Sequence, residues 1–308
     1  MRKILITGAG GAGSVEIWKL LNRRYKLYFC DQEISLINNL IPSNKKFQVV
    51  NANSKNYIKS ITAIIKKLKI DLLVPAVDEE ISSLFSKKNN IKNIFCPSKK
   101  MSLIFLDKFK TSTLLKKNKF CDLNTQIIKS KKNFPINKNL IVKPRLGRGS
   151  RMVHRISNFF QFKSYLNLYK LKTSEVIIQK FIEGQEYTVF VHSDEDGKLR
   201  SVVPVKVLSK KGVTLHGVTE NNKMIINFIK EFNNKFKIQN CYNVQLIIKK
   251  KKIYVIEINP RISTTFIMTL KLGYDPFSKL GGETIFVPKK KLILKRFWNN
   301  VFYEKKYN

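Results

Sequence analysis

Cysteine is scarce in this chain of 308 residues, which holds four of them. They are widely scattered and none lies in a C-x-x-C pair, which argues against a zinc site or a disulfide framework. The four are Cys30, Cys96, Cys121 and Cys241. No apolar run reaches the roughly 18 residues of a membrane span, and the run that follows Met1 is too short for a signal peptide. We therefore expect a cytoplasmic protein without a transmembrane segment.

Acidic residues are also few, so the chain is strongly basic. It has 59 Lys and Arg against 21 Asp and Glu, a formal net charge of +38. Such a charge is typical of nucleic-acid-binding proteins. However, the cations are mostly Lys, they are spread along the chain, and no motif that reads DNA or RNA accompanies them. Lys, Asn and Ile are encoded by AT-rich codons, so genome composition is an alternative explanation for much of the charge. We expect no dedicated nucleic-acid partner, with a non-catalytic polyanion-binding protein as an alternative.

A glycine motif follows the first predicted strand, at residues 3–7. Gly8, Gly10 and Gly13 fit G-x-G-x-x-G, and Asp31 supplies an acidic residue about 20 positions on. This is the dinucleotide fingerprint, in which glycines allow a tight turn and a helix N-terminus favours an anion. An NAD-dependent oxidoreductase is therefore an alternative function. The other explanation is that the glycines only pack a strand against its helix.

Strands and helices alternate over about residues 1–100, which predicts a parallel, doubly wound sheet. The expected strands are 3–7, 27–30, 47–50, 71–76 and 94–96, and the expected helices are 14–21 and 57–68. Asp78 and Glu79 lie just beyond a strand's carboxyl end, where such sheets bind ligands. They are candidates for substrate contact, or else carboxylates that stabilise the start of a helix.

The middle of the chain combines basic residues with glycines. Residues 98–120 have helical spacing, with Lys108 inside the predicted helix. A strand over 140–144, a loop with glycines and arginines, and a second strand at 152–153 predict a hairpin. Glycines let backbone N–H groups face an anion, and Lys143 adds a point charge. We expect this hairpin to be a mobile flap that covers phosphate groups.

Two polar side chains share one face of a strand near the C-terminus. In the stretch YVIEINPR, Glu257 and Asn259 point to the same side because strand residues alternate. Oxygen ligands on one face suit a hard cation such as Mg²⁺. A three-residue loop at 250–252 would place Gln245 opposite Glu257 and on that face. Arg261 leaves the sheet where a second anion could lie.

The remaining segments give weaker signals. Residues 212–220 are predicted to form an exposed loop on the ligand side, with His216 as a candidate substrate contact. A short helix over 267–272 is expected to end at Gly273. The tail from Val287 is expected to pack on the last domain. Its apolar residues are Leu292, Ile293, Phe297, Trp298, Phe302 and Tyr303.

Four pieces therefore stand in one order: an αβ domain, a Lys strand with a glycine loop, an apolar-E-G-x-E hinge, and Q…E-x-N-P-R. This resembles the ATP-grasp superfamily, nearest to enzymes like the carbamoyl phosphate synthase large subunit and related carboxylate–amine ligases. The resemblance covers nearly the whole chain. It implies an α/β fold with a Rossmann-like domain at 1–104, a small central subdomain with the flap at 105–178, and an α+β C-terminal subdomain with the metal site at 179–308.

The resemblance also implies a role for each matched residue. The implied ATP contacts are Lys108, Lys143, Gly147, Arg148, Gly149, Ser150, Gln179, Lys180, Phe181, Ile182 and Glu186, the last on the ribose hydroxyls. The implied ligands of Mg²⁺ or Mn²⁺ are Gln245, Glu257 and Asn259, with two ions expected. Arg261 and Lys143 are the implied catalytic residues, and Asp78, Glu79, His216 and Ser263 are the candidate substrate contacts. Gln179 stands where many relatives have Glu, and Glu257 is the only carboxylate in the implied metal set.

The implied reaction is an ATP-dependent ligation. ATP would transfer its γ-phosphoryl group to a substrate carboxylate, and an amine or similar nucleophile would displace phosphate from the acyl phosphate. The expected partners are a small-molecule carboxylate and a small-molecule amine, and a homodimer is left open. In this family the N-terminal domain does not generally bind NAD, which weakens the dinucleotide interpretation of the glycine motif.

Overall fold

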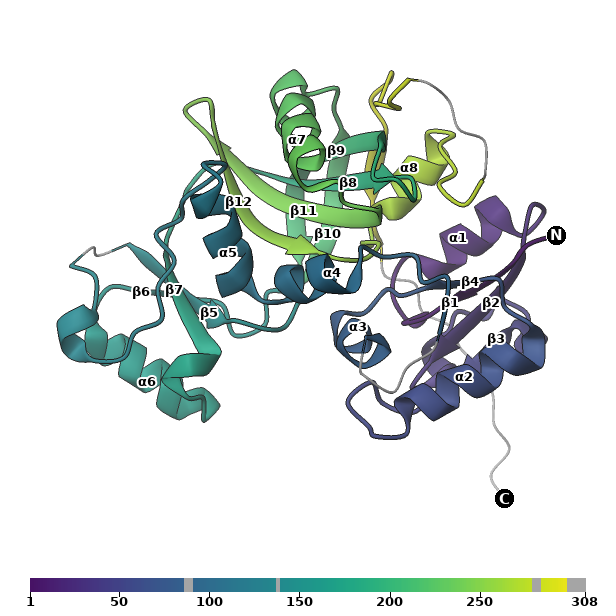
Figure 1. The fold of residues 1–308 in the computed structure, drawn as a ribbon, viewed down its shortest axis with the longest axis horizontal. Coiled ribbons are helices and arrows are strands. Elements are labelled where there is room, and N and C mark those ends of the chain that lie inside the picture. The colour runs from purple at the N-terminus through teal and green to yellow at the C-terminus, as the bar shows by residue number, and fades with distance from the viewer. Residues whose placement is uncertain (86–90, 137–138, 279–283, 298–308) are drawn as a thin grey trace.

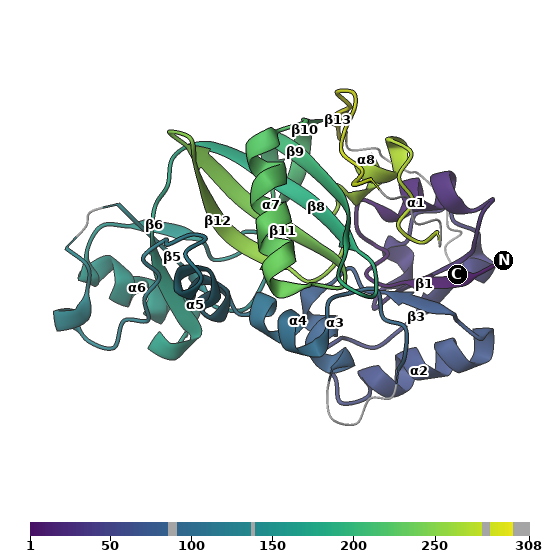
Figure 2. The same ribbon diagram turned by 45° about the horizontal axis from the view of Figure 1, so that its top comes forward.

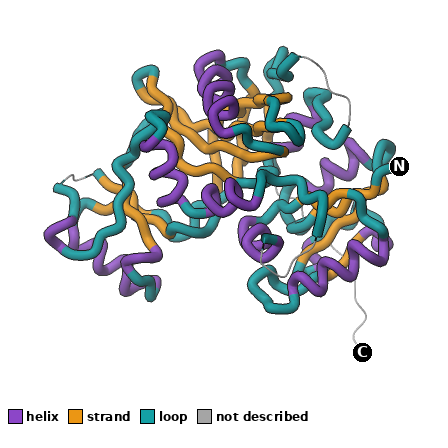
Figure 3. The backbone as a smooth tube through the Cα atoms, viewed as in Figure 1, coloured by secondary structure: helices purple, strands orange, loops and turns teal. Residues whose placement is uncertain are grey.

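The computed structural model describes residues 1–85, 91–136, 139–278 and 284–297, whose strands form three sheets (Figures 1 and 2). The largest sheet lies in the middle of the molecule, with the N-terminal sheet on one side and the small sheet on the other. Loops connect the small sheet to the rest of the chain (Figure 3). No helix in these described segments is both long and apolar enough to cross a membrane.

The N-terminal sheet is parallel, with the strand order β3-β2-β1-β4. Its elements are β1 (Lys3–Ile6), α1 (Ser14–Leu21), β2 (Lys26–Asp31), η1 (Ile34–Leu36), η2 (Ser43–Lys45), β3 (Lys46–Gln48), α2 (Tyr57–Leu68), β4 (Leu72–Val74) and α3 (Asp78–Leu84). Strand alternation explains its two apolar faces. Ile4 and Ile6 pack in the cluster that contains Ile17 of α1. Leu5 points the other way and packs with Ile61 of α2. The predicted parallel sheet with helices on both faces is confirmed.

The expected strand at 94–96 is wrong. Only one bridge forms there, between Ile94 and Leu73. The chain turns at once, because the N–H of Cys96 donates to the carbonyl of Ile94 at 2.9 Å. Pro97 follows and has no N–H with which to extend a ladder.

The predicted helical stretch at 98–120 is broken into α4 (Lys99–Leu106) and α5 (Lys108–Lys117). The break lies at Asp107, whose backbone is extended and whose carboxylate accepts hydrogen bonds from the N–H groups of Phe109 and Lys110. This is N-capping, which satisfies donors that the first turn leaves unpaired. Lys108 therefore opens α5 instead of lying inside a helix, and its side chain is buried at 9% exposure.

The small sheet is antiparallel, with the order β6-β5-β7. Its elements are η3 (Lys131–Asn133), β5 (Leu140–Pro144), β6 (His154–Ile156), α6 (Phe159–Tyr169), η4 (Thr173–Glu175) and β7 (Val176–Lys180). Helix α6 covers one face, where Phe162 packs with Val142 and Ile178. The predicted hairpin forms, but its second strand starts later than expected. Met152 still belongs to the turn, with a left-handed φ of 55°.

The large sheet is antiparallel, with the order β12-β11-β8-β9-β10-β13. Its elements are β8 (Gln185–Ser193), β9 (Leu199–Lys211), β10 (Val213–Thr219), α7 (Lys223–Phe236), β11 (Asn240–Lys249), β12 (Lys252–Asn259), α8 (Phe266–Lys271) and β13 (Ile293–Lys295). One face of α7 packs Ile225, Ile229 and Phe232 into the core of this sheet. Helix α8 packs against α1 and so ties the large sheet to the N-terminal domain.

Two expectations in this region have clear outcomes. Residues 212–220 do not form a loop: most of them make strand β10, which pairs with β9 and β13. Because β13 is part of the tail, the tail does pack on the last domain over residues 293–295. Trp298, Phe302 and Tyr303 lie outside the described residues. The short helix before Gly273 is confirmed, and Gly273 has the left-handed φ of 96° that favours glycine.

The β11–β12 hairpin confirms the predicted register, although its loop is shorter than expected. Lys249 pairs with Lys252, so the turn holds only Lys250 and Lys251, both at positive φ. A register shift between Gln245 and Leu246 then restores the pairing of Gln245 with Glu257. The bulge adds one residue to β12, which shifts the pairing by the same amount as a third loop residue would have done.

Candidate functional site

Two lysines converge on Glu257 of β12. Lys108 of α5 places Nζ 3.6 Å from Oε2 of Glu257, and both side chains are largely buried, at 9% and 14% exposure. Lys143 of β5 is 4% exposed, and its Nζ donates to the carbonyl of Ile256 at 3.2 Å. The pKa of Lys143 is lowered from 10.5 to about 8, chiefly by burial; Lys108 and Lys210 also lower it, and Glu257 opposes them. Three elements therefore hold two cations beside one carboxylate.

The same face of the sheet carries amide oxygens. Asn259 Nδ2 donates to Glu257 Oε1 at 3.2 Å. Gln245 pairs directly with Glu257, and Asn243 with Asn259, so these four side chains share one face of the antiparallel pair. A carboxylate with neighbouring amide oxygens is the kind of donor set that Mg²⁺ accepts, because this ion usually binds one or two carboxylates together with substrate phosphates. No cluster of three His, Cys, Asp or Glu side chains that could hold a metal exists among the described residues.

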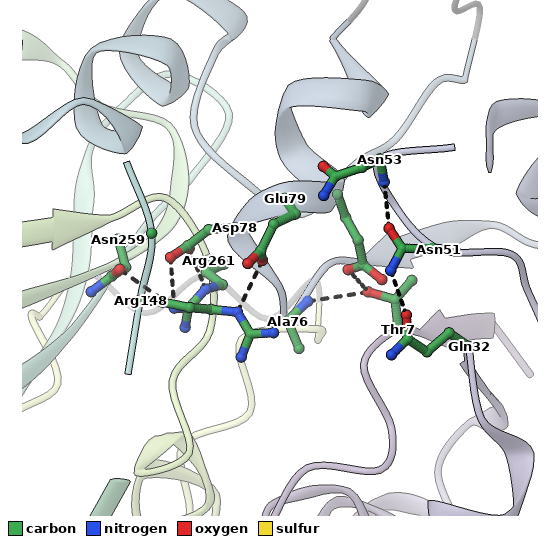
Figure 4. Close-up of polar contacts among 12 residues, drawn as sticks. Thr7, Gln32, Asn51, Asn53, Ala76, Asp78, Glu79, Arg148, Asn259 and Arg261 are labelled. Carbon is green, nitrogen blue, oxygen red and sulfur yellow. Dashed lines mark hydrogen bonds and ion pairs between the residues drawn. The ribbon is translucent and has the colours of Figure 1, made fainter. Parts of the chain in front are cut away.

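Arg261 lies at the end of β12 and is held by the N-terminal domain (Figure 4). Its Nε and Nη2 atoms donate to the two carboxylate oxygens of Asp78, the second at 3.1 Å. Nη2 also lies 3.4 Å from Asn259 Oδ1, and Nη1 donates to the carbonyl of Ile262 at 3.1 Å. Burial opposes the charge of Arg261, but Asp78 outweighs it and raises the pKa of the guanidinium. Asp78 thus contacts Arg261 directly.

The flap between β5 and β6 contacts α5 through Lys108 and α3 through Glu79. Lys108 Nζ donates to the carbonyl of Gly147 at 2.5 Å. Arg148 Nε donates to Glu79 Oε2 at 2.9 Å, and this pair is about one third exposed (Figure 4). Gly147 and Gly149 have φ values of 113° and 70°, which glycine adopts without strain. Ser150, the next residue of the flap, also has a left-handed φ, of 56°.

The hinge residues run from the end of β7 into the start of β8. Gln179 is 3% exposed, and its Nε2 donates to Thr125 Oγ1 at 2.7 Å. Phe181 stacks under the guanidinium of Arg155 at 3.7 Å, Lys180 is exposed, and Ile182 is buried. Glu186 pairs with Lys210 at 2.6 Å.

The hinge requires glycine at position 184 because of a close backbone contact. A Cβ atom there would lie 2.5 Å from the carbonyl oxygen of Ile248, closer than such contacts occur. The backbone of the hinge at Gly184 therefore lies too close to the backbone of β11 for a side chain to fit between them.

Two candidate residues lie apart from these contacts. His216 sits in β10, and strands β9, β8 and β11 separate it from β12 in the sheet order. Ser263 follows Arg261 closely but hydrogen-bonds to Thr265 at 2.8 Å. No described contact joins either residue to Glu257 or Lys143.

The glycine motif is engaged in packing. The N–H of Gly10 donates to Asp31 Oδ2 at 2.9 Å, so the acidic residue of the fingerprint holds the turn itself. A Cβ at Gly10 would meet Leu36 Cβ at 2.8 Å. Arg296 donates to the carbonyls of Ala12 and Thr264 and links the turn to the C-terminal part. These contacts favour the packing explanation of the glycines.

Several supporting residues were not identified from the sequence. Asn243 is buried; its Oδ1 accepts from Thr188 at 2.9 Å, and its Nδ2 has no hydrogen-bond partner in the described part of the chain. The alternation N-V-Q at 243–245 mirrors E-I-N at 257–259 and could have revealed it. Thr125 and Lys210 carry no local signal, because their importance comes only from tertiary partners.

Comparison with known protein families gives one match to an established domain. The family described as "ATP-grasp domain" matches residues 105–265, which is more than half of the chain and includes the flap, the hinge and the Glu257 strand. The carbamoyl phosphate synthase large chain of Caldanaerobacter subterraneus subsp. tengcongensis is 26% identical over 164 residues, which are 49% of this chain and 15% of that protein. The D-alanine--D-alanine ligase of Petrotoga mobilis is 27% identical over 142 residues, which are 41% of this chain and 47% of that protein. The matches thus span less than half the length of these two curated relatives.

Solved structures resemble most of the fold. The L-amino acid ligase from Bacillus licheniformis has a TM-score of 0.64 at 13% identity, covering 88% of this chain and 70% of that one. N5-carboxyaminoimidazole synthetase from Staphylococcus aureus in complex with ADP has a TM-score of 0.68 at 15% identity. The match covers 90% of this chain and 75% of that one. At such identities the likeness concerns the fold alone.

Proposed function

This chain belongs to the ATP-grasp family, and from that premise we propose that it is an ATP-dependent ligase that requires a divalent metal. It would phosphorylate a substrate carboxylate and join the acyl group to an amine or similar nucleophile, releasing ADP and phosphate. One observation carries this proposal: Lys108, Lys143 and Glu257 converge from three separate elements at one buried site. The ligases among its relatives are consistent with this chemistry.

The phosphate groups of ATP would lie against Lys108 and Lys143. Lysine binds phosphate as a point charge, and both side chains are already held in place by neighbouring contacts. The flap residues Gly147, Arg148, Gly149 and Ser150 would cover the phosphates, with backbone N–H groups and one guanidinium supplying donors. A closed flap excludes water, which protects an acyl phosphate from hydrolysis.

The adenosine would lie along the hinge. Gln179, Lys180, Phe181 and Ile182 would contact the base, partly through their backbone groups, and Glu186 would accept hydrogen bonds from the ribose hydroxyls. Glu186 now contacts Lys210 at 2.6 Å, and this exposed pair can separate at small energetic cost.

Glu257, Asn259 and Gln245 would hold Mg²⁺ or Mn²⁺, with Glu257 shared between two ions. A bound divalent ion neutralises charge on the phosphoryl group that is transferred. The chain's own residues do the positioning: Arg261 would contact the transferred phosphoryl group, and Lys143 would hold the phosphates. Glu79, His216 and Ser263 remain the proposed substrate contacts. Asp78 was the fourth candidate, but Arg261 occupies both of its carboxylate oxygens.

The proposed domain division places the first boundary after residue 104 and the second after residue 178. The first unit contains the parallel sheet, and the second boundary falls within β7, a strand of the small sheet. The substrates would be a small-molecule carboxylate and a small-molecule amine, and we propose a cytoplasmic location. Neither a dedicated nucleic-acid partner nor NAD chemistry is part of the proposal.

An ADP-release assay tests this function. Amino acids and other carboxylates are screened in pairs with candidate amines, with Mg-ATP present. The proposal predicts ADP release that depends on a particular pair, and Glu257→Ala should lower turnover by on the order of 10²–10³, as for other lost electrostatic stabilisers. Full activity of Glu257→Ala would contradict the metal assignment. A polyanion-binding protein would instead release no ADP with any pair and would lose its affinity steeply with added salt.

A further inference from the structure

Asp78 and Arg261 form a bidentate, buried ion pair between helix α3 and the end of β12, 183 residues apart in the chain. Their side chains are 8% and 12% exposed. A carboxylate that accepts from both Nε and Nη2 fixes the plane of a guanidinium as well as its position. Arg261 is thus oriented by a residue of a different domain from its own.

The orientation leaves part of the guanidinium available. Nη1 donates one of its two N–H groups to the carbonyl of Ile262. Nη2 donates one to Asp78 Oδ2 at 3.1 Å, and its other contact is a long one of 3.4 Å to Asn259 Oδ1. Because Asp78 occupies the edge formed by Nε and Nη2, the second N–H group of Nη2 and those of Nη1 lie on the other edges of the planar guanidinium. Asn259 in turn donates to Glu257 at 3.2 Å. A continuous row of polar contacts therefore runs from Asp78 through Arg261 and Asn259 to Glu257 (Figure 4 shows the first three).

We propose that Asp78 is a positioning residue, which acts through Arg261 to aim its free N–H groups at the phosphoryl group that is transferred. This inference rests on the proposed function, because it needs a phosphoryl group at this site. The contact assigns α3 of the N-terminal domain a part in phosphate recognition. Loss of the Asp78 carboxylate would leave Arg261 charged and buried, but its guanidinium could rotate away from the transferred phosphoryl group.

Nucleotides that differ by one phosphate provide the test. Binding of Mg-ADP and of Mg-AMPPNP, an ATP analogue with a γ-phosphate, is measured by calorimetry on the full chain. Asp78→Asn should weaken Mg-AMPPNP about tenfold, the value of one charge-assisted contact, and leave Mg-ADP within about twofold. Arg261→Lys should give the same pattern, and the double variant should be no weaker than Arg261→Lys alone.

A second variant covers the case in which Asp78→Asn does not fold. Asp78→Glu keeps the charge but shifts the carboxylate by one methylene, so it should reduce the preference for Mg-AMPPNP about threefold. Asp194→Asn is the matched control, because Asp194 pairs with Arg200 at 2.7 Å in the turn between β8 and β9. It removes an Asp–Arg pair of similar chemistry, and it should leave both affinities unchanged.

The outcomes separate this inference from the function on which it rests. If the unaltered protein bound neither nucleotide, both would be overturned. If the unaltered protein bound both nucleotides, two results would overturn the inference and give Asp78 only a structural role. One is that the Asp78 variants weaken the binding of both nucleotides equally, and the other is that their effect adds fully to that of Arg261→Lys. A selective, non-additive loss of Mg-AMPPNP affinity supports it.

Discussion

The Nζ atom of Lys108 lies 3.6 Å from Oε2 of Glu257, inside the protein. A metal ion on Glu257 would have to share that carboxylate with the ammonium group. Replacing Lys108 by Met should therefore have opposite effects on two ligands. Mn²⁺ alone should bind about tenfold more tightly, because a competing charge is removed, whereas ATP should bind at least about tenfold more weakly.

Electron paramagnetic resonance of free Mn²⁺ and calorimetry with Mg-ATP measure the two effects. Lys116→Met is the matched control, because Lys116 lies on the same helix but pairs with Asp122 at the surface. Equal affinity for Mn²⁺ in Lys108→Met and the unaltered protein would contradict the metal role of Glu257.

Lys143 should show a conflict between stability and function. It is a buried cation with two cationic neighbours, Lys108 and Lys210, and one anionic neighbour, Glu257, which it shares with Lys108. Replacing a poorly compensated buried charge by an apolar side chain of similar length often stabilises a protein. Lys143→Met should therefore raise the free energy of unfolding by about 1–2 kcal/mol while it weakens Mg-ATP binding. Urea denaturation and calorimetry measure these quantities, and a destabilised variant with normal ATP affinity would refute the assignment.

The contact between Arg148 and Glu79 should restrain the flap. Because the pair is about one third exposed, Glu79→Gln should change the stability by less than about 1 kcal/mol. The freed flap should be cut faster by trypsin after Arg148 and Arg151, and Mg-ATP should slow this cleavage. Glu16→Gln, which breaks the exposed pair with Lys19, is the control. Unchanged cleavage in Glu79→Gln would show that the contact does not hold the flap.

Glu80 should make stability depend on pH. It is 5% exposed, accepts a hydrogen bond from Thr7, and burial raises its pKa from 4.5 to about 7. The folded protein then keeps a proton that the unfolded chain releases above pH 4.5. The free energy of unfolding should therefore fall as pH rises from about 4.5 to 7, by on the order of 3 kcal/mol.

Glu80→Gln resembles the protonated form and should remove this dependence. Urea denaturation at pH 5 and at pH 8 compares the two proteins. The variant should be the more stable one at pH 8 and nearly equal to the unaltered protein at pH 5. Parallel pH profiles for both would show that Glu80 is ionised in the folded state.

Local patterns predicted the fold and one face of the site well. The continuous apolar run of Ile4, Leu5 and Ile6 correctly indicated a strand, which the structure buries on both faces. The spacing of Glu257 and Asn259 correctly placed them together. Gln245 was placed opposite Glu257, although a bulge and a two-residue turn achieve this instead of a longer loop.

Contacts between distant segments could not be predicted in the same way. Periodicity tells which face a residue occupies but not which domain will meet that face, so the pairing of Asp78 with Arg261 had no local signal. The break before Lys108 did have one, because an Asp at position 107 is a common helix cap. Residues 213–219 form a strand that pairs with β9 along one edge, and β13, from a distant part of the tail, pairs with the other edge.

Equilibrium titration with Mg-ATP and, separately, with NADH tests the central claim most directly. The site built around Glu257 predicts that Mg-ATP binds, that its affinity depends on Mg²⁺, and that Glu257→Gln weakens it at least about tenfold while NADH does not bind. Binding of NADH without any binding of Mg-ATP would contradict the account and favour the glycine motif as the functional site.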